Sequence, residues 1–173
     1  MKKMNLQFFA DARTGVNPTN EILFGVCTTG RPADIKTADY TTVKDAESLS
    51  VSIDGSMESW NPMDAGGWAR NLMTAKSLTI SMGGKRNYGD KGNDYVAGLA
   101  FKMGQDCNSA MKITFPNLDV LYIPCVINVT TLGGDSTAIE ALEWEVASDG
   151  RPEYVSYTCL LYTSPSPRDK RQS

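Results

Sequence analysis

The segment Ser48–Asp54, with sequence SLSVSID, alternates strictly between apolar residues and serines. In an extended chain, successive side chains point to opposite faces. Leu49, Val51 and Ile53 therefore share one face, and the serines occupy the other. This pattern predicts a β-strand with one face in a hydrophobic core.

Similar strand signals follow in both directions from this segment. The predicted strands are Glu21–Thr28, Lys76–Met82, Met111–Phe115, Val120–Thr130, Ile139–Ala147 and a further one that starts at Tyr154–Thr158. In Ile139–Ala147 the alternation places Leu142, Trp144 and Val146 inward and the glutamates outward. Pro124 interrupts Val120–Thr130, which predicts an edge strand or a bulge there.

One segment has a helical period instead. Gly92–Met103 places a stripe of apolar residues at helical spacing: Tyr95, Val96, Leu99, Ala100 and Met103. Asp90 or Asn93 is the predicted N-cap, and Gly104 is expected just past the last turn. Seven or eight strands and one helix predict a mainly β fold, a rolled β-sandwich or barrel with a flanking α-helix.

The C-terminal residues have a different character. Cys159–Asp169 reads CLLYTSPSPRD, which resembles the translation of a sequencing-library adapter, and Lys170–Ser173 fits its continuation. We expect residues 159–173 to be a non-native tail, as opposed to a Pro/Ser-rich disordered one. Without this tail, Lys+Arg falls from 17 to 14 and Asp+Glu from 20 to 19, so the net charge changes from -3 to about -5.

The remaining chain is of a length that suits one domain. We expect a mobile N-terminal arm over residues 1–20 and a single β-domain over 21–158. The segment MNLQFFA near the start is too short and too polar for the apolar region of a signal peptide. No apolar run has the length of a membrane span.

The sequence offers little for catalysis. It contains no histidine, which excludes the Ser-His-Asp triad and imidazole acid–base steps. Cys27, Cys107 and Cys125 lack the paired spacing of zinc ligands and are interpreted as buried small hydrophobes. Gly83–Arg86 (GGKR) lacks the spacing of a phosphate loop. We therefore expect no enzyme activity, no metal and no cofactor.

The connection Gly55–Ala75, GSMESWNPMDAGGWARNLMTA, is unusual between two well-patterned strands. A connection of this length without secondary structure of its own is uncommon, and it is usually functional or disordered. Trp, Met and Arg are enriched at protein interfaces. The predicted interface residues are Trp60, Met63, Trp68, Arg70 and Met73. The alternative is that the tryptophans fold back onto the core of their own domain.

Four stretches of this sequence resemble the major tail tube proteins of long-tailed (siphovirus-type) bacteriophages. They are Met4–Ala10 (MNLQFFA), Gly66–Met82 (GGWARNLMTAKSLTISM), Asn87–Ala100 (NYGDKGNDYVAGLA) and Ile127–Tyr154 (INVTTLGGDSTAIEALEWEVASDGRPEY). The last is the most specific, because its GGDST loop, LEW strand and SDGRP turn match the closing hairpin of that family. Leu118 departs from the pattern, since a turn glycine is expected there.

This resemblance implies a virion structural protein that assembles in the host cytoplasm. Six copies would form a ring, the rings would stack into a hollow tube, and the long inter-strand loop would dock onto the neighbouring ring. Tape-measure, tail terminator and baseplate proteins are the implied partners. DNA would pass through the bore during ejection without specific binding, and no membrane insertion is expected.

Electrostatics is compatible with that bore. A basic lining would gain affinity for DNA by counterion release, whereas an acidic one repels DNA over about 8 Å. Glu140, Glu143 and Glu145 are the candidate lumen-facing residues. Two alternatives stay open: a monomeric carbohydrate-binding β-sandwich with Trp60 and Trp68 as its sugar platform, and another ring-forming tube or head–tail completion protein.

Overall fold

A computed structural model describes residues 15–157 of the chain. The predicted non-native tail lies outside these residues, as does most of the predicted N-terminal arm. Within the described range, seven strands form one antiparallel sheet in the order β1-β4-β5-β6-β3-β2, and β7 pairs with β5. The strands are β1 (Leu23–Val26), β2 (Ala46–Trp60), β3 (Arg70–Lys85), β4 (Asn108–Thr114), β5 (Val120–Gly133), β6 (Ala141–Ser148) and β7 (Glu153–Val155).

The helical elements are short. They are the α-helix α1 (Lys91–Ala97) and the 3-10 helices η1 (Thr19–Glu21), η2 (Met63–Ala65) and η3 (Gly104–Cys107). The prediction of a mainly β fold with one α-helix is confirmed.

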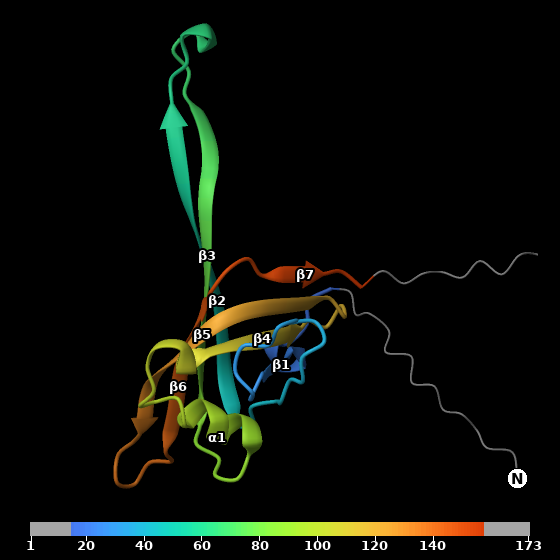
Figure 1. Cartoon of the computed structure of the whole chain (residues 1–173), viewed down its shortest axis with the longest axis vertical. Coiled ribbons are helices and arrows are strands. Elements are labelled where there is room, and N and C mark those ends of the chain that lie inside the picture. The colour runs from blue at the N-terminus through green and yellow to red at the C-terminus, as the bar shows by residue number, and fades with distance from the viewer. Residues whose placement is uncertain (1–14, 158–173) are drawn as a thin grey trace, which may run out of the picture.

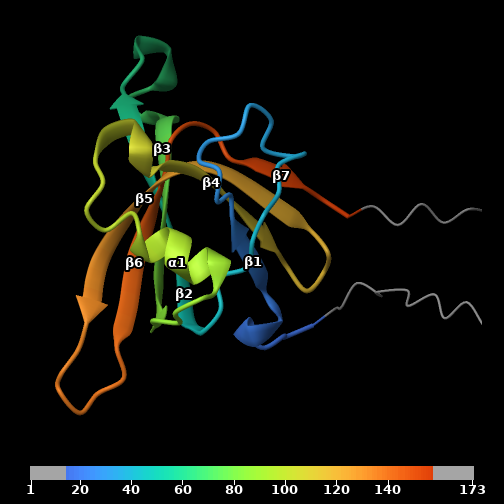
Figure 2. The same cartoon turned by 60° about the horizontal axis from the view of Figure 1, so that its bottom comes forward.

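The sheet is rolled around one hydrophobic core. Figures 1 and 2 show β4 and β5 crossing the direction of β2 and β3. In Figure 1, α1 lies at the end of the domain opposite to the protruding hairpin. The inward residues of the alternating strands form the core, α1 adds Val96, and the turn after α1 adds Leu99. Ile80, Leu142 and Trp144 are almost completely buried, as the alternation predicts.

Strand β5 is central in the sheet, so the predicted edge position of Pro124 is wrong. One side of β5 pairs with β4 along its length, and Ala110 lies opposite Pro124. On the other side β7 pairs with Val120–Tyr122 and β6 pairs from Cys125 onward. Pro124 lies between these two partners, where no ladder bond needs its missing N–H. Its carbonyl accepts a hydrogen bond from the Asp149 amide, N to O 2.8 Å.

The helix is shorter than the sequence predicts. Asp90 is the N-cap, as expected, because its carboxylate accepts a hydrogen bond from the Asn93 amide. Regular helix ends at Ala97 with Gly98 as the C-cap, and tight turns continue to residue 101. Met103, expected on the buried stripe, is exposed. A glycine inside a short helix costs about 1 kcal/mol relative to alanine, which favours termination there.

Hydrogen bonds to Asp119 connect β7 and the residues after it to the turn between β4 and β5. The Asp119 carboxylate accepts hydrogen bonds from the Tyr154 hydroxyl and from the Tyr157 amide, the latter at 2.7 Å. The Tyr154 bond, followed by the Tyr157 bond, lowers the pKa of Asp119 below its usual value. Leu118 in this turn has φ 68°, a left-handed conformation that glycine adopts more readily. The expectation that a turn glycine belongs here is therefore consistent with the backbone.

Candidate assembly surfaces

The most prominent surface feature is a hairpin that leaves the sheet. β3 pairs with β6 only from Thr79 onward, whereas its pairing with β2 continues to Trp60↔Arg70. Residues 54–77 therefore form a two-stranded extension, which we call the arm; it projects away from the domain in Figure 1. At about 3.4 Å per residue, its paired part is about 20 Å long.

This finding corrects the prediction for Gly55–Ala75. The segment is a continuation of two strands, and only residues 61–69 at its end lie outside them. The sequence pattern does not predict that these strands continue into the arm. Both faces of the arm are exposed, and the apolar alternation of β2 stops at Ile53. Pairing with the neighbouring strand extends the ladder beyond the part that the core stabilises.

The predicted interface residues all lie on this arm. Trp60, Met63, Trp68 and Met73 are exposed large hydrophobic residues, and the side chain of Arg70 is exposed as well. The alternative in which Trp60 and Trp68 pack on their own core is therefore wrong. Two further apolar residues of the arm, Met57 and Leu72, are exposed and were not singled out in the sequence. Val51 and Ile53, just before the arm, were predicted to face the core and are exposed as well, so that prediction is wrong for these two residues.

The arm ends in a defined turn, residues 61–69, which we call the tip. The Ala65 amide donates to the Pro62 carbonyl at 3.2 Å, and the Trp68 amide donates to the Ala65 carbonyl at 3.1 Å. Gly66 and Gly67 have φ values of 58° and 90°, a conformation that other residues adopt only at a cost. The two glycines thus allow the chain to reverse and leave Met63 and Trp68 pointing into solvent.

A second surface is the sheet face that points away from the core. On β2 and β3 it carries hydroxyl-bearing residues, among them Ser50, Ser52 and Ser81, all exposed. On β6 it carries Glu143 and Glu145, which the register places opposite Gly83 and Ser81 of β3. We call this the polar face.

Charge on the polar face is mainly negative. Asp54 of β2 alternates onto the same face as the serines and adds a third carboxylate. Lys85 of β3 alternates onto this face as a basic residue, and its Nζ lies 3.6 Å from a Glu47 carboxylate oxygen. The Thr131 hydroxyl donates to Glu143 at 2.9 Å.

Glu140 does not belong to this face. It precedes β6, and its carboxylate accepts a hydrogen bond from the Tyr88 hydroxyl at 2.8 Å. This bond raises the pKa of Tyr88. The three glutamates that the sequence grouped together are therefore divided, with Glu143 and Glu145 on the polar face and Glu140 beside Tyr88.

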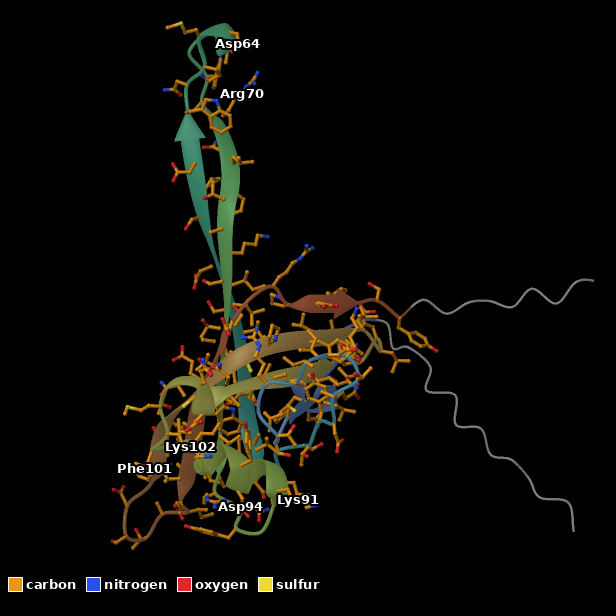
Figure 3. The ribbon with its side chains drawn as sticks, in the orientation of Figure 1. Asp64, Arg70, Lys91, Asp94, Phe101 and Lys102 are labelled. Atoms are coloured by element: carbon orange, nitrogen blue, oxygen red, sulfur yellow. The ribbon has the colours of Figure 1, made fainter. Side chains whose placement is uncertain are left out.

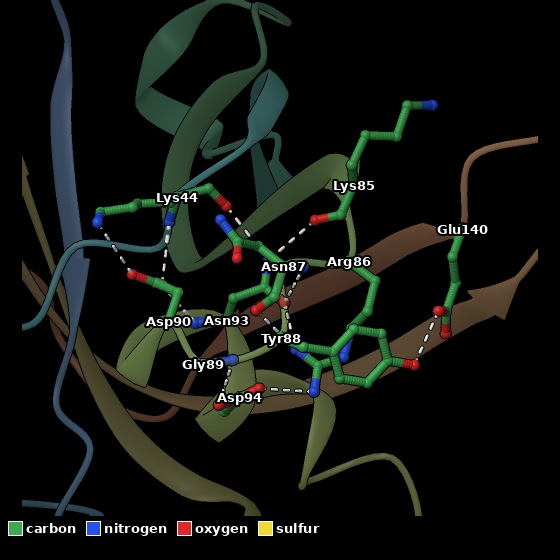
Figure 4. Close-up of polar contacts among 10 residues, drawn as sticks. All are labelled: Lys44, Lys85, Arg86, Asn87, Tyr88, Gly89, Asp90, Asn93, Asp94 and Glu140. Carbon is green, nitrogen blue, oxygen red and sulfur yellow. Dashed lines mark hydrogen bonds and ion pairs between the residues drawn. The ribbon is translucent and has the colours of Figure 1, made fainter.

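A buried amide joins α1 to the sheet, as Figure 4 shows. The Asn93 side chain is 1% exposed and accepts hydrogen bonds from the Arg86 guanidinium at 2.7 Å and the Asn87 amide at 3.0 Å. Its NH2 group donates to the carbonyls of Lys85 at 2.9 Å and Lys44 at 3.2 Å. Asn93 was considered as a helix cap from the sequence, and its role as a connector was missed because Lys44 lies far away in the chain and the other partners lie before the helix.

Among the described residues, few side chains are suited to metal binding or nucleophilic catalysis. No group of three or more potential metal ligands occurs among residues 15–157. Cys27, Cys107 and Cys125 are buried, as predicted, and burial raises the pKa of the Cys125 thiol to about 12. A thiol with so high a pKa is a poor nucleophile at neutral pH. None of the described helices is long and apolar enough to cross a membrane.

Comparison with known proteins identifies the fold. No protein-family model matches the sequence, and neither does any curated protein. Among solved structures, the chain is similar to one from the tail of an empty gene transfer agent particle with C6 symmetry, with a TM-score of 0.60 and 14% identity over 82% of this chain and 100% of that chain. It is also similar to a chain from the virion of a native gene transfer agent particle, with a TM-score of 0.59 and 15% identity over the same shares. The chain thus has the fold of these particle proteins.

Proposed function

We propose that this protein is a structural subunit of a phage-like tail tube. The observation that carries the proposal is the arm, a free hairpin with exposed tryptophan and methionine side chains on a fold shared with a gene transfer agent tail chain. Large exposed apolar residues in a contiguous segment mark interaction sites. The subunit is not an enzyme in this proposal, and its principal partner is another copy of itself.

Six copies form each ring in this proposal. The C6 symmetry belongs to the tail of the similar particle, and it supplies the number. Strand β2 is an edge of the sheet, so its outer N–H and C=O groups have no strand partner among the described residues. Val51 and Ile53 are exposed on the core side of that edge. An unprotected edge with apolar side chains is suited to contact a neighbouring subunit.

The polar face lines the bore in this proposal. The face consists mainly of serines, threonines and carboxylates, without a cluster of basic residues that could bind phosphates. DNA therefore gains no affinity for the wall from counterion release. The carboxylates repel DNA over about 8 Å at physiological salt. Tape-measure protein would occupy the bore before DNA, and terminator and baseplate proteins would close the ends of the tube.

Reversing charge on the polar face should make assembled tubes retain DNA. We expect tubes of the double variant Glu143→Lys, Glu145→Lys to bind a short fluorescent duplex about 10-fold or more tightly than wild-type tubes, with binding that falls steeply as salt rises. Both side chains are on an outward strand face, so the fold should be unaffected. Co-sedimentation of the duplex with tubes at several salt concentrations measures this.

A matched control changes the net charge equally away from the polar face. Asp135→Lys, Glu140→Lys alters the loop before β6 and the residue beside Tyr88. Tubes of this control should retain no more DNA than the wild type. Equal retention by both variants would contradict the placement of Glu143 and Glu145 in the bore.

A further inference from the structure

Two exposed apolar clusters lie at opposite ends of the molecule. One is the tip of the arm. The other is the turn between α1 and η3, where Phe101 is 91% and Met103 86% exposed. Figure 3 places Asp64 and Arg70 at the far end of the arm and Phe101 and Lys102 at the opposite end of the long axis. We call Phe101, Lys102 and Met103 the pole patch.

The pole patch is held in place by its neighbours in the chain. Leu99, 2% exposed, anchors the turn in the core. The Ala100 amide donates to the Ala97 carbonyl at 3.2 Å, and the Lys102 amide donates to the Leu99 carbonyl at 3.0 Å. Two large apolar side chains are thus presented to solvent by a hydrogen-bonded turn, although single exposed hydrophobic residues need no explanation.

The two clusters match in chemistry. The tip presents Met63 and Trp68 and carries one charged residue, Asp64, whose side chain is 75% exposed. The pole patch presents Phe101 and Met103 and carries one charged residue of opposite sign, Lys102. Among the described residues, no carboxylate lies within ion-pair distance of Lys102, and Asp64 has only the distant Arg70 guanidinium at 4.0 Å.

We propose that the tip of one copy docks on the pole patch of a second copy in the adjacent ring. Trp68 and Met63 pack against Phe101 and Met103, and Asp64 pairs with Lys102. This inference rests on the proposed tube function and names the receiving surface. A tip cannot reach the pole patch of its own chain, because the two lie at opposite ends of the molecule. A contact between two different surfaces is heterologous and generates an open stack when it repeats along one axis.

A mixing experiment tests this head-to-tail contact. Trp68→Ala inactivates the tip and leaves the pole patch intact, whereas Phe101→Ala does the reverse. Each variant alone should form rings that do not stack. In an equimolar mixture, the intact tips of Phe101→Ala rings should dock on the intact pole patches of Trp68→Ala rings, which gives pairs of rings and no longer stacks. Sedimentation velocity and negative-stain electron microscopy distinguish single rings, pairs and tubes.

A charge exchange tests the same contact independently. Asp64→Lys and Lys102→Asp should each weaken stacking about 10-fold or more, because every ring presents the repulsive pair six times. The double variant Asp64→Lys, Lys102→Asp should recover most of the loss. Both side chains are exposed, so thermal unfolding of all the variants should resemble that of the wild type.

The outcomes separate this inference from the function on which it rests. If wild-type protein forms tubes and Phe101→Ala and Lys102→Asp form them equally well, the pole patch is not the receiving surface and the tube function stands. If Trp68→Ala stacks normally, the tip is not the docking element. Wild-type protein that neither forms rings nor stacks would overturn the tube function and the docking contact together.

Discussion

Removal of residues 57–74, the outer part of the arm, should abolish stacking of the rings while leaving the domain folded. Replacing Met57–Thr74 by Asn-Gly closes the hairpin between Ser56 and Ala75, which already pair, through a two-residue turn that this dipeptide favours. The deleted residues contribute nothing to the buried core. We expect the midpoint of thermal unfolding to change by only a few degrees and tube formation to fall below detection.

The mechanism of this loss is the removal of exposed apolar anchors. Trp68, Trp60 and Met63 together carry the surface that the proposal assigns to stacking, and such aromatic residues dominate interface energetics. Negative-stain electron microscopy over a concentration series should show single rings or free subunits for the shortened protein. Serine replacements at Asn71 and Thr74, two exposed polar positions of the arm, are the control and should leave tubes intact. Tubes of normal length from the shortened protein would contradict a stacking role for the arm.

Asn93 should be the polar residue with the largest effect on stability. Its side chain makes four hydrogen bonds that join α1, the end of β3 and the segment before β2. Asn93→Ala leaves the carbonyls of Lys44 and Lys85 and the Asn87 amide without these partners. Each unsatisfied buried group costs about 1–3 kcal/mol, so we expect a loss of about 2–4 kcal/mol in the free energy of unfolding.

The measurement needs a form that does not polymerise. Urea unfolding of Asn93→Ala in the arm-shortened protein provides one. Asn93→Leu, which fills a similar volume without hydrogen bonds, should be destabilised as strongly as Asn93→Ala. Lys91→Ala, an exposed position of the same helix, should change stability by less than about 0.5 kcal/mol. A nearly neutral Asn93→Leu would show that packing, and not the polar network, stabilises this corner.

Strands with one buried face were predictable because burial leaves a period of two in the sequence. Leu142, Trp144 and Val146 revealed β6 in this way. The alternation of Leu49, Val51 and Ile53 also revealed β2, but only Leu49 packs against the core, whereas Val51 and Ile53 are exposed in the free chain. The arm has no such period of two in its sequence, since residues on both of its faces contact solvent in the free chain. Its backbone pairing is dictated by the neighbouring strand, which a local pattern does not report.

The helix shows the reverse error. Apolar spacing over Gly92–Met103 matched a helix, yet Gly98 ends the regular part and Met103 is exposed. Periodicity records which residues an uninterrupted helix would bury, and it does not include the cost of a glycine in its interior. The exposed Met103 became informative only when the structure separated it from the buried stripe.

The candidate surfaces were predictable in composition and not in position. Trp, Met and Arg in one segment indicated an interface, and all five predicted residues lie on the arm. The grouping of Glu140 with Glu143 and Glu145 was based on sequence proximity, but Glu140 precedes β6 and its carboxylate is bound by the Tyr88 hydroxyl. The pole patch had no signal of its own, because Phe101 and Met103 resemble ordinary core residues until the turn is known.

The most direct test of the tube function is electron microscopy of the purified protein as it assembles. Wild-type protein, concentrated stepwise and imaged in negative stain, should form rings whose end views have six-fold symmetry and hollow tubes that lengthen with concentration. Class averages of the end views give the symmetry and show the bore. A folded protein that stays monomeric across the whole series would contradict the tube function and favour a monomeric binding module with Trp60 and Trp68 as its exposed platform.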